Sequence, residues 1–126
     1  MARKKYKIFC VDFDGTVVDK RKFPLHGPDI PYCVEVMLGL IEKGHKIILN
    51  TMRSGPALDA AIKWYEERNI PLYSINTCPG QKHWTKSPKC DGDVYIDDKN
   101  FGIKMIQTEE MENPGVDWLP IKEMYL

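Results

Sequence analysis

Four short apolar runs stand out along the first hundred residues. Each is rich in β-branched and aromatic residues with little polar alternation, a pattern typical of strands buried on both faces of a parallel sheet. They cover residues 6–11, 45–51, 72–75 and 93–96. A fifth strand is predicted at 115–121, and Pro120 favours a position at the sheet edge.

Apolar residues at helical spacing separate the first three runs. A helix is predicted to begin at Pro31 and stop at Gly44, with an apolar face of Val34, Met37, Leu38 and Ile41. A second helix is expected after an N-cap at Ser54, with Pro56 in its first turn and Asn69 at its end. Its apolar face would be Ala57, Leu58, Ala61, Ile62 and Tyr65.

The segments between these elements complete the predicted fold. We expect a hairpin-like flap at 17–28, a long loop at 76–92 and a short amphipathic helix at 104–111. Long loops in compact domains are often functional. The alternation of strands and helices predicts an α/β fold, a three-layer Rossmann-like arrangement with a mostly parallel sheet between helices.

Composition narrows the class of protein. The chain has 126 residues, which predicts one domain over 1–126, and Lys+Arg and Asp+Glu balance at 18 each. This balance gives no case for nonspecific binding to nucleic acid or to a membrane surface. The chain has no apolar run near the roughly 20 residues that span a bilayer and no signal-peptide pattern. The basic Arg3-Lys4-Lys5 run is interpreted as a solvated end.

Cysteine usage favours a cytoplasmic location. The four cysteines are Cys10, Cys33, Cys78 and Cys90, and we expect them to be reduced thiols that are buried or incidental. Cys78 and Cys90 flank His83, which leaves a metal clip as an alternative. Their spacing matches no strong zinc pattern.

Polar side chains follow the strands, at the point where each strand ends. Asp12 and Asp14 follow the first strand and Asn76 follows the third. Thr51 and Arg53 follow the second strand, and Asp97-Asp98 follows the fourth. Ligands bind outside the carboxyl ends of parallel strands, so these residues predict one site.

The residue types at this predicted site favour a hard cation and a phosphoryl group. Oxygen ligands from Asp12, Asp97 and Asp98 suit Mg²⁺, which usually recruits a phosphate. The Thr51 hydroxyl and the backbone N–H groups around Phe13, Asp14 and Gly15 could bind phosphate oxygens. Either Lys86 or Lys89 could offset the remaining negative charge. One aspartate could attack the phosphorus while the other moves protons.

The motif Asp12-Phe13-Asp14-Gly15-Thr16-Val17 resembles the first motif of the haloacid dehalogenase (HAD) superfamily of phosphohydrolases. Thr51, at the end of its apolar strand, is similar to the second motif. Lys89 is similar to the lysine of the third motif, with Lys86 as the alternative. Asp97-Asp98 is similar to the acidic fourth motif. The resemblance covers about the first hundred residues.

The resemblance implies specific roles. Asp12 would be the nucleophile and a magnesium ligand, and Asp14 the general acid/base that gives its backbone carbonyl to the metal. Asp97 and Asp98 would complete the metal site. Thr51 and Lys89 would hold the phosphoryl group.

The resemblance also bears on the substrate. Neither loop where family members carry a cap domain is long enough to fold separately, so the protein resembles the small capless type. An open site admits varied phosphorylated small molecules, or is covered by a second subunit of a homo-oligomer. Arg53, His83 and Trp84 are candidate contacts for the leaving group, although loop packing also accounts for them.

Two alternative functions remain open at this point. The first is a non-catalytic module that keeps the acidic pocket to bind metal or phosphate. The presence of Asp14 two residues after Asp12 favours an enzyme over this module. The second is a phosphotransferase with the same nucleophile and an acceptor other than water.

Overall fold

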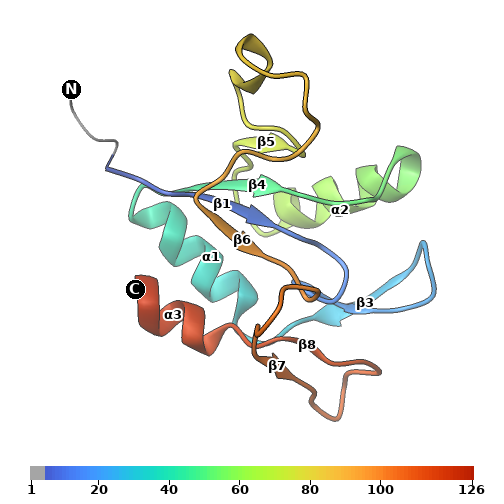
Figure 1. The fold of residues 1–126 in the computed structure, drawn as a ribbon. Helices are drawn as coiled ribbons and strands as arrows, with labels where there is room; N and C mark the ends of the chain where they lie inside the picture. Colours follow the sequence, from blue (N-terminus) through green and yellow to red (C-terminus); the bar gives the residue numbers. More distant parts are fainter. Residues whose placement is uncertain (1–4) are drawn as a thin grey trace.

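A four-stranded parallel sheet forms the centre of the computed structural model, which describes residues 5–126 (Figure 1). The strand order is β5-β4-β1-β6. Their bounds are β1 Ile8–Val11, β4 Lys46–Leu49, β5 Ser74–Ile75 and β6 Val94–Ile96. Phe9 of β1 pairs with Ile47 of β4 and Val94 of β6, so β1 lies between two parallel neighbours. The predicted α/β class with a mostly parallel sheet is confirmed. Arg3 and Lys4 of the predicted basic end lie outside the described residues.

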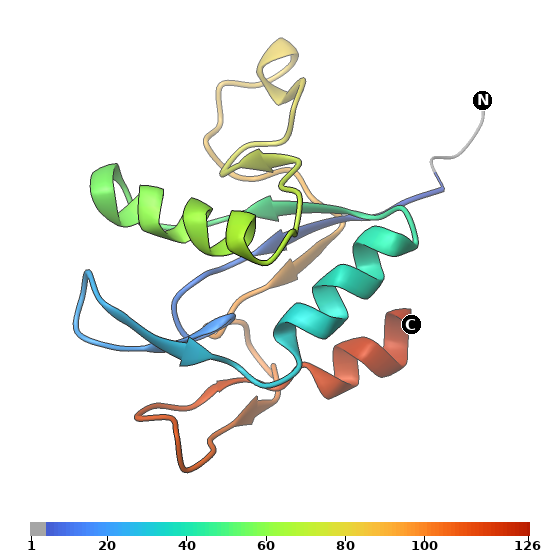
Figure 2. The ribbon, with the colours of Figure 1, turned by 180° about the vertical axis from the view of Figure 1, so that it is seen from behind.

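Helices cover one face of the sheet. Helix α1 spans Cys33–Glu42 and α2 spans Gly55–Glu67, and both lie on the same side of the strands (Figure 2). Two right-handed crossovers that step in one direction across a sheet put their helices on one face. The third helix, α3 at Leu119–Tyr125, packs beside α1. No helix within residues 5–126 is long and apolar enough to cross a membrane.

The other face of the sheet is covered by the segment 76–93 rather than by an α-helix. Ile8, Cys10 and Ile48 are buried there with Cys90. A short 3-10 helix, η1 Gln81–His83, lies within this segment. The buried Gln81 amide accepts hydrogen bonds from the N–H groups of Cys78 (2.9 Å) and Asp91 (3.1 Å), which gives the loop a fixed shape.

The cysteines differ from the prediction. Cys10 and Cys90 form a disulfide, whereas Cys33 is a buried thiol. The expected reduced state is therefore wrong for Cys10 and Cys90, and the Cys90 sulfur is not available for a metal clip. The two residues are 80 positions apart in the chain, so only the path of segment 76–93 brings them together.

The buried faces of α1 and α2 agree with the predicted ones in part: Met37 of α1 and Ala57, Ala61 and Tyr65 of α2 are buried as expected. Helix α1 buries Cys33, Val36, Met37 and Leu40, whereas Leu38 is exposed. The helix begins after Tyr32 rather than at Pro31. The Cys33 thiol donates to the carbonyl of Val17 (3.3 Å), and Cys33 lies on the buried face of the helix. In α2 the largest buried side chain is Trp64, which the predicted face omitted.

The C-terminal third corrects two predictions. The expected helix at 104–111 and strand at 115–121 are replaced by a short hairpin of β7 Met105–Ile106 and β8 Gly115–Val116, followed by α3. Pro120 lies in the first turn of α3, where its missing N–H costs nothing. The buried Trp118 indole donates to the Thr16 carbonyl (2.8 Å), so this segment contacts the turn after β1.

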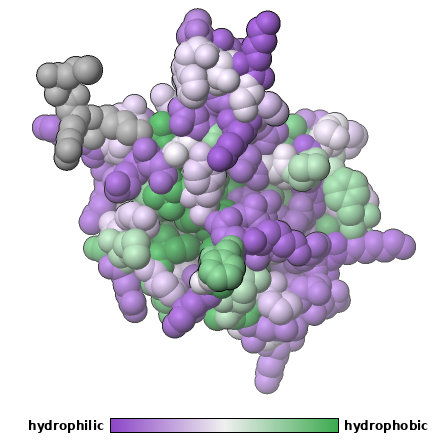
Figure 3. Space-filling view, in the orientation of Figure 1, coloured by the Kyte–Doolittle hydropathy of each residue, from purple (hydrophilic) through white to green (hydrophobic). Residues whose placement is uncertain are grey.

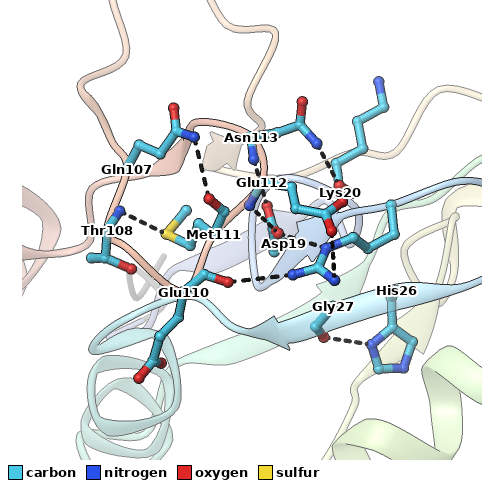
Figure 4. Close-up of polar contacts among 11 residues, drawn as sticks. Asp19, Lys20, His26, Gly27, Gln107, Thr108, Glu110, Met111, Glu112 and Asn113 are labelled. Atoms are coloured by element: carbon cyan, nitrogen blue, oxygen red, sulfur yellow. Dashed lines mark hydrogen bonds and ion pairs between the residues drawn. The ribbon is translucent and has the colours of Figure 1, made fainter.

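The predicted flap is a hairpin of β2 Val18–Lys20 and β3 His26–Asp29. Asp19 anchors it to the C-terminal hairpin (Figure 4). The fully buried Asp19 carboxylate accepts from the N–H groups of Glu112 (2.8 Å) and Asn113 (3.2 Å) and from Arg21 Nε (2.8 Å). Burial alone would raise the pKa of Asp19, but the hydrogen bonds from Glu112, Arg21 and Asn113, with the Arg21 charge, outweigh it and lower that pKa.

Replacing Asp19 with asparagine is expected to reduce the free energy of unfolding by about 2–4 kcal/mol at neutral pH, because it replaces one of two accepting carboxylate oxygens with an NH₂ donor and removes the negative charge that pairs with Arg21. A group whose pKa is lower in the folded protein than in the unfolded chain contributes stability at pH values above its unfolded-state pKa. This contribution is lost as the pH falls through the folded-state pKa. The difference in the free energy of unfolding between wild type and Asp19→Asn should therefore shrink below about pH 4. Urea unfolding at pH 7 and pH 3 measures it. A difference that does not change with pH would contradict the assignment.

Candidate functional site

Asp12 lies directly after β1, next to the end of β6. Its N–H donates to the carbonyl of Ile96 in β6 (2.9 Å). The buried Thr16 hydroxyl donates to Asp12 Oδ2 (2.9 Å) and accepts from the N–H of Asp98 (3.1 Å). Oxygens of Asp12, Asp97 and Asp98 lie within 4.8 Å of one another. The tight turn after β1 thus brings the first and fourth predicted clusters together.

The electrostatics of this acidic cluster favour a bound cation. Burial, followed by the negative charges of Asp97 and Asp98, raises the pKa of Asp12 to about 8. Burial and the neighbouring Asp97 also raise the pKa of Asp98. Three close carboxylates are the donor set that a hard divalent cation prefers. The residues therefore fit Mg²⁺, with Asp12, Asp97 and Asp98 as side-chain ligands.

Gly15 allows this approach of the two loops. Its φ is +80°, a conformation that residues with a Cβ rarely adopt, and a Cβ there would lie 2.6 Å from Asp98 Oδ2. Gly44 has a similar φ of +89°, but a Cβ there would meet no part of the described chain within 4 Å beyond its immediate neighbours. Alanine substitutions at Gly15 and Gly44 can therefore be compared. Both place a Cβ at a positive φ, but only the substitution at Gly15 also displaces Asp98.

Gly15→Ala is expected to reduce stability by about 2–3 kcal/mol and to weaken Mg²⁺ binding, because the new methyl group displaces Asp98. Gly44→Ala should reduce stability by only about 1 kcal/mol, the cost of a Cβ at a positive φ, and should leave metal binding unchanged. Urea unfolding and calorimetric titration with Mg²⁺ measure both effects. Equal losses in the two variants, with equal metal affinity, would contradict the close approach of Gly15 to Asp98.

Asp14 forms an ion pair with Arg53 and is not one of the three clustered carboxylates. The Arg53 guanidinium donates to both Asp14 oxygens, at 2.8 and 2.7 Å. It also donates to the carbonyls of Pro24 (3.0 Å) and Ala57 (3.2 Å) and lies 5.0 Å from the centre of the Phe13 ring. Arg53 is only 3% exposed. The structure thus places the Arg53 guanidinium, a predicted substrate contact, in an ion pair that orients the partly exposed Asp14 carboxylate.

A cavity of about 300 Å³ opens over the acidic cluster. Its lining residues come from the loops at the carboxyl edge of the sheet and from the β2–β3 hairpin. They are Asp12, Asp14, Lys20, Arg21, Phe23, Thr51, Met52, Asp97, Asp98 and Lys99. Asn76 lies behind Thr51 and accepts from its N–H (2.8 Å). The side chain of Phe13 is buried in the core, so only its backbone could bind a phosphate.

The predicted lysines do not line this cavity. Lys89 Nζ lies 5.9 Å from the Tyr95 ring, beside a separate cavity of about 330 Å³ that Trp84 also lines. The next residue, Cys90, is bonded to the middle of β1, which holds this part of the loop against the sheet face. Lys86 is exposed on the same loop. Trp84, like these lysines, is therefore away from the acidic cluster.

Lys20 and Lys99 are the lysines that line the cavity. Sequence reasoning missed both. Lys99 directly follows Asp97-Asp98, which was a usable signal, since a loop that carries two ligands also carries its next residue to the site. Lys20 could be found only by knowing how the hairpin folds over the strand ends.

Comparisons with known proteins define the family only in part. No family model matches the chain, and no curated protein matches it. The chain is similar to the solved structure of a conserved protein coded by a locus from Bacteroides thetaiotaomicron, with a TM-score of 0.77 and 35% identity. The match covers 95% of this chain and 89% of the other. At this identity and coverage, the chain belongs to the same family as that protein.

Proposed function

We propose that the protein is a magnesium-dependent phosphohydrolase of the HAD type that hydrolyses phosphomonoesters through an aspartyl-phosphate. The observation that carries this proposal is the cluster of Asp12, Asp97 and Asp98 in a cavity that also contains Thr51 and Asp14. A metal site alone would not need a hydroxyl and a further carboxylate beside it. The resemblance of the first motif supports the same reading.

In the proposed reaction, an Asp12 oxygen attacks the phosphorus and the bond to the leaving oxygen breaks. Asp14 gives that oxygen a proton, and later takes one from the water that attacks the aspartyl-phosphate. Asp14 must first turn from Arg53, since both its oxygens are engaged there. Thr51 and Lys99 hold the phosphoryl oxygens. Magnesium, when bound, neutralises charge on the phosphoryl group and on Asp12.

The test is release of inorganic phosphate from a panel of phosphomonoesters that includes an aryl phosphate. We expect release with Mg²⁺, and none after removal of the metal with EDTA. Release that persists without metal would contradict the proposed site. No release from any ester would contradict the enzymatic function.

A non-catalytic binding module is a second candidate, and the Arg53–Asp14 ion pair favours it. A carboxylate held at both oxygens by a buried guanidinium is poorly placed to move protons. This candidate predicts binding of Mg²⁺ and inorganic phosphate by calorimetry without turnover of any ester in the panel.

A further inference from the structure

Two apolar side chains are exposed in the cavity above the acidic cluster. Phe23 is 66% exposed and Met52 is 99% exposed, and both line the cavity. Hydrophilic residues predominate on the face seen in Figure 3. Apolar surface within a polar cavity is unfavourable in the empty site and is a feature of sites that contact an apolar part of a ligand.

The Phe23 ring contacts one buried cation. The Arg53 guanidinium carbon lies 5.6 Å from its ring centre, and Arg53 also donates to the carbonyl of the next residue, Pro24 (3.0 Å). The ion pair with Asp14 fixes Arg53 in turn. An aromatic ring that is positioned before binding loses little conformational entropy when a ligand stacks on it.

Phe101 is also an exposed phenylalanine, but its surroundings differ. It is fully exposed, yet it does not line the cavity, and no contact between its ring and another ring or cation is found among the described residues. Phe23 differs because its ring is held by Arg53 beside the carboxylates.

We propose that Phe23 is a stacking platform for a planar aromatic ring in the leaving group of the substrate. This inference rests on the proposed function, because the phosphate of that substrate would lie over Asp12 and Thr51. A nucleobase and a simple aryl group both have this chemistry. Lys20 and Lys99, which line the same cavity, suit the anionic end of either ligand.

The test compares the affinities of matched esters for the Asp12→Asn protein with Mg²⁺, by calorimetry. A nucleoside 5′-monophosphate and ribose 5-phosphate differ only in the base, and 2-phenylethyl and 2-cyclohexylethyl phosphate differ only in the ring. We expect the aromatic member of at least one pair to bind about tenfold more tightly. A preference in the first pair identifies a nucleobase, and one confined to the second identifies an aryl group.

Variants of Phe23 then assign the preference. Phe23→Leu should reduce the ratio of the affinities for the aromatic and non-aromatic esters to near one. Phe23→Tyr keeps an aromatic ring and should keep this ratio, and Phe101→Leu should leave it unchanged. Circular dichroism and thermal unfolding check that each variant is folded. Equal affinities within both pairs, or a ratio that survives in Phe23→Leu, would overturn the inference.

Binding is measured separately from turnover so that two failures can be told apart. A wild-type protein that binds aromatic esters preferentially but releases no phosphate contradicts the proposed function and supports the stacking platform. A protein that hydrolyses esters without regard to the aromatic ring supports the function and overturns the platform.

Discussion

Asp12→Asn is expected to reduce phosphate release by about 10³-fold or more, because an amide cannot form the aspartyl-phosphate. Asparagine keeps the size of the side chain and an oxygen that can accept from the Thr16 hydroxyl. The fold should therefore be retained. The substitution also removes one of three crowded carboxylates, so metal-free protein should be no less stable than wild type. Steady-state phosphate release and urea unfolding measure the two effects.

Asp59→Asn is the matched control for this substitution. Asp59 is an exposed aspartate on α2 and does not line the cavity. Its conversion to asparagine should leave phosphate release unchanged and stability within about 0.5 kcal/mol of wild type, as for ordinary surface positions. Activity in Asp12→Asn above a tenth of the wild-type rate would contradict the role of Asp12 as nucleophile.

Arg53→Met is expected to reduce the free energy of unfolding by about 3 kcal/mol, because it leaves Asp14 and the Pro24 and Ala57 carbonyls without their donor. Arg53→Lys should recover only part of the stability, because an ammonium cannot reproduce the two parallel hydrogen bonds. Denaturant unfolding of the three proteins measures the series.

Arg68 provides a comparison with the same geometry at the surface. It donates to both oxygens of Asp29, at 2.8 and 2.9 Å, but both side chains are partly exposed. Arg68→Met should therefore cost less than about 1 kcal/mol. A similar loss in Arg68→Met and Arg53→Met would show that burial does not set the strength of the Arg53–Asp14 pair.

The part of the site that sequence could predict depends on strand ends. Asp12, Thr51 and Asp97 each follow an apolar run, and parallel strands bring their carboxyl ends to one edge whatever the loops do. Lys89 was placed at the site by its resemblance to the third motif and not by a strand end, and a disulfide between residues 80 positions apart decides where its loop lies. Arg53 was placed in the correct loop, but its burial against Asp14 depends on the flap folding over it.

The C-terminal region could not be predicted because its structure depends on distant contacts. The strand predicted from Gly115 onward is only two residues long, and Trp118 is buried against the turn at Thr16. Short apolar segments carry too few positions to distinguish strand from helix, so packing decides. Asp19 was missed for a similar reason, since two of its donors, the backbone N–H groups of residues 112 and 113, come from the far end of the chain.

The most direct test of the proposed mechanism is to trap the phosphoryl group on Asp12. Wild-type protein is mixed with an aryl phosphate and Mg²⁺, quenched during turnover and treated with borohydride, which reduces an acyl phosphate to an alcohol. We predict that mass spectrometry finds homoserine at position 12, and none in Asp12→Asn or without Mg²⁺. Sustained phosphate release with an unmodified Asp12, or with the modification on another carboxylate, would contradict the mechanism.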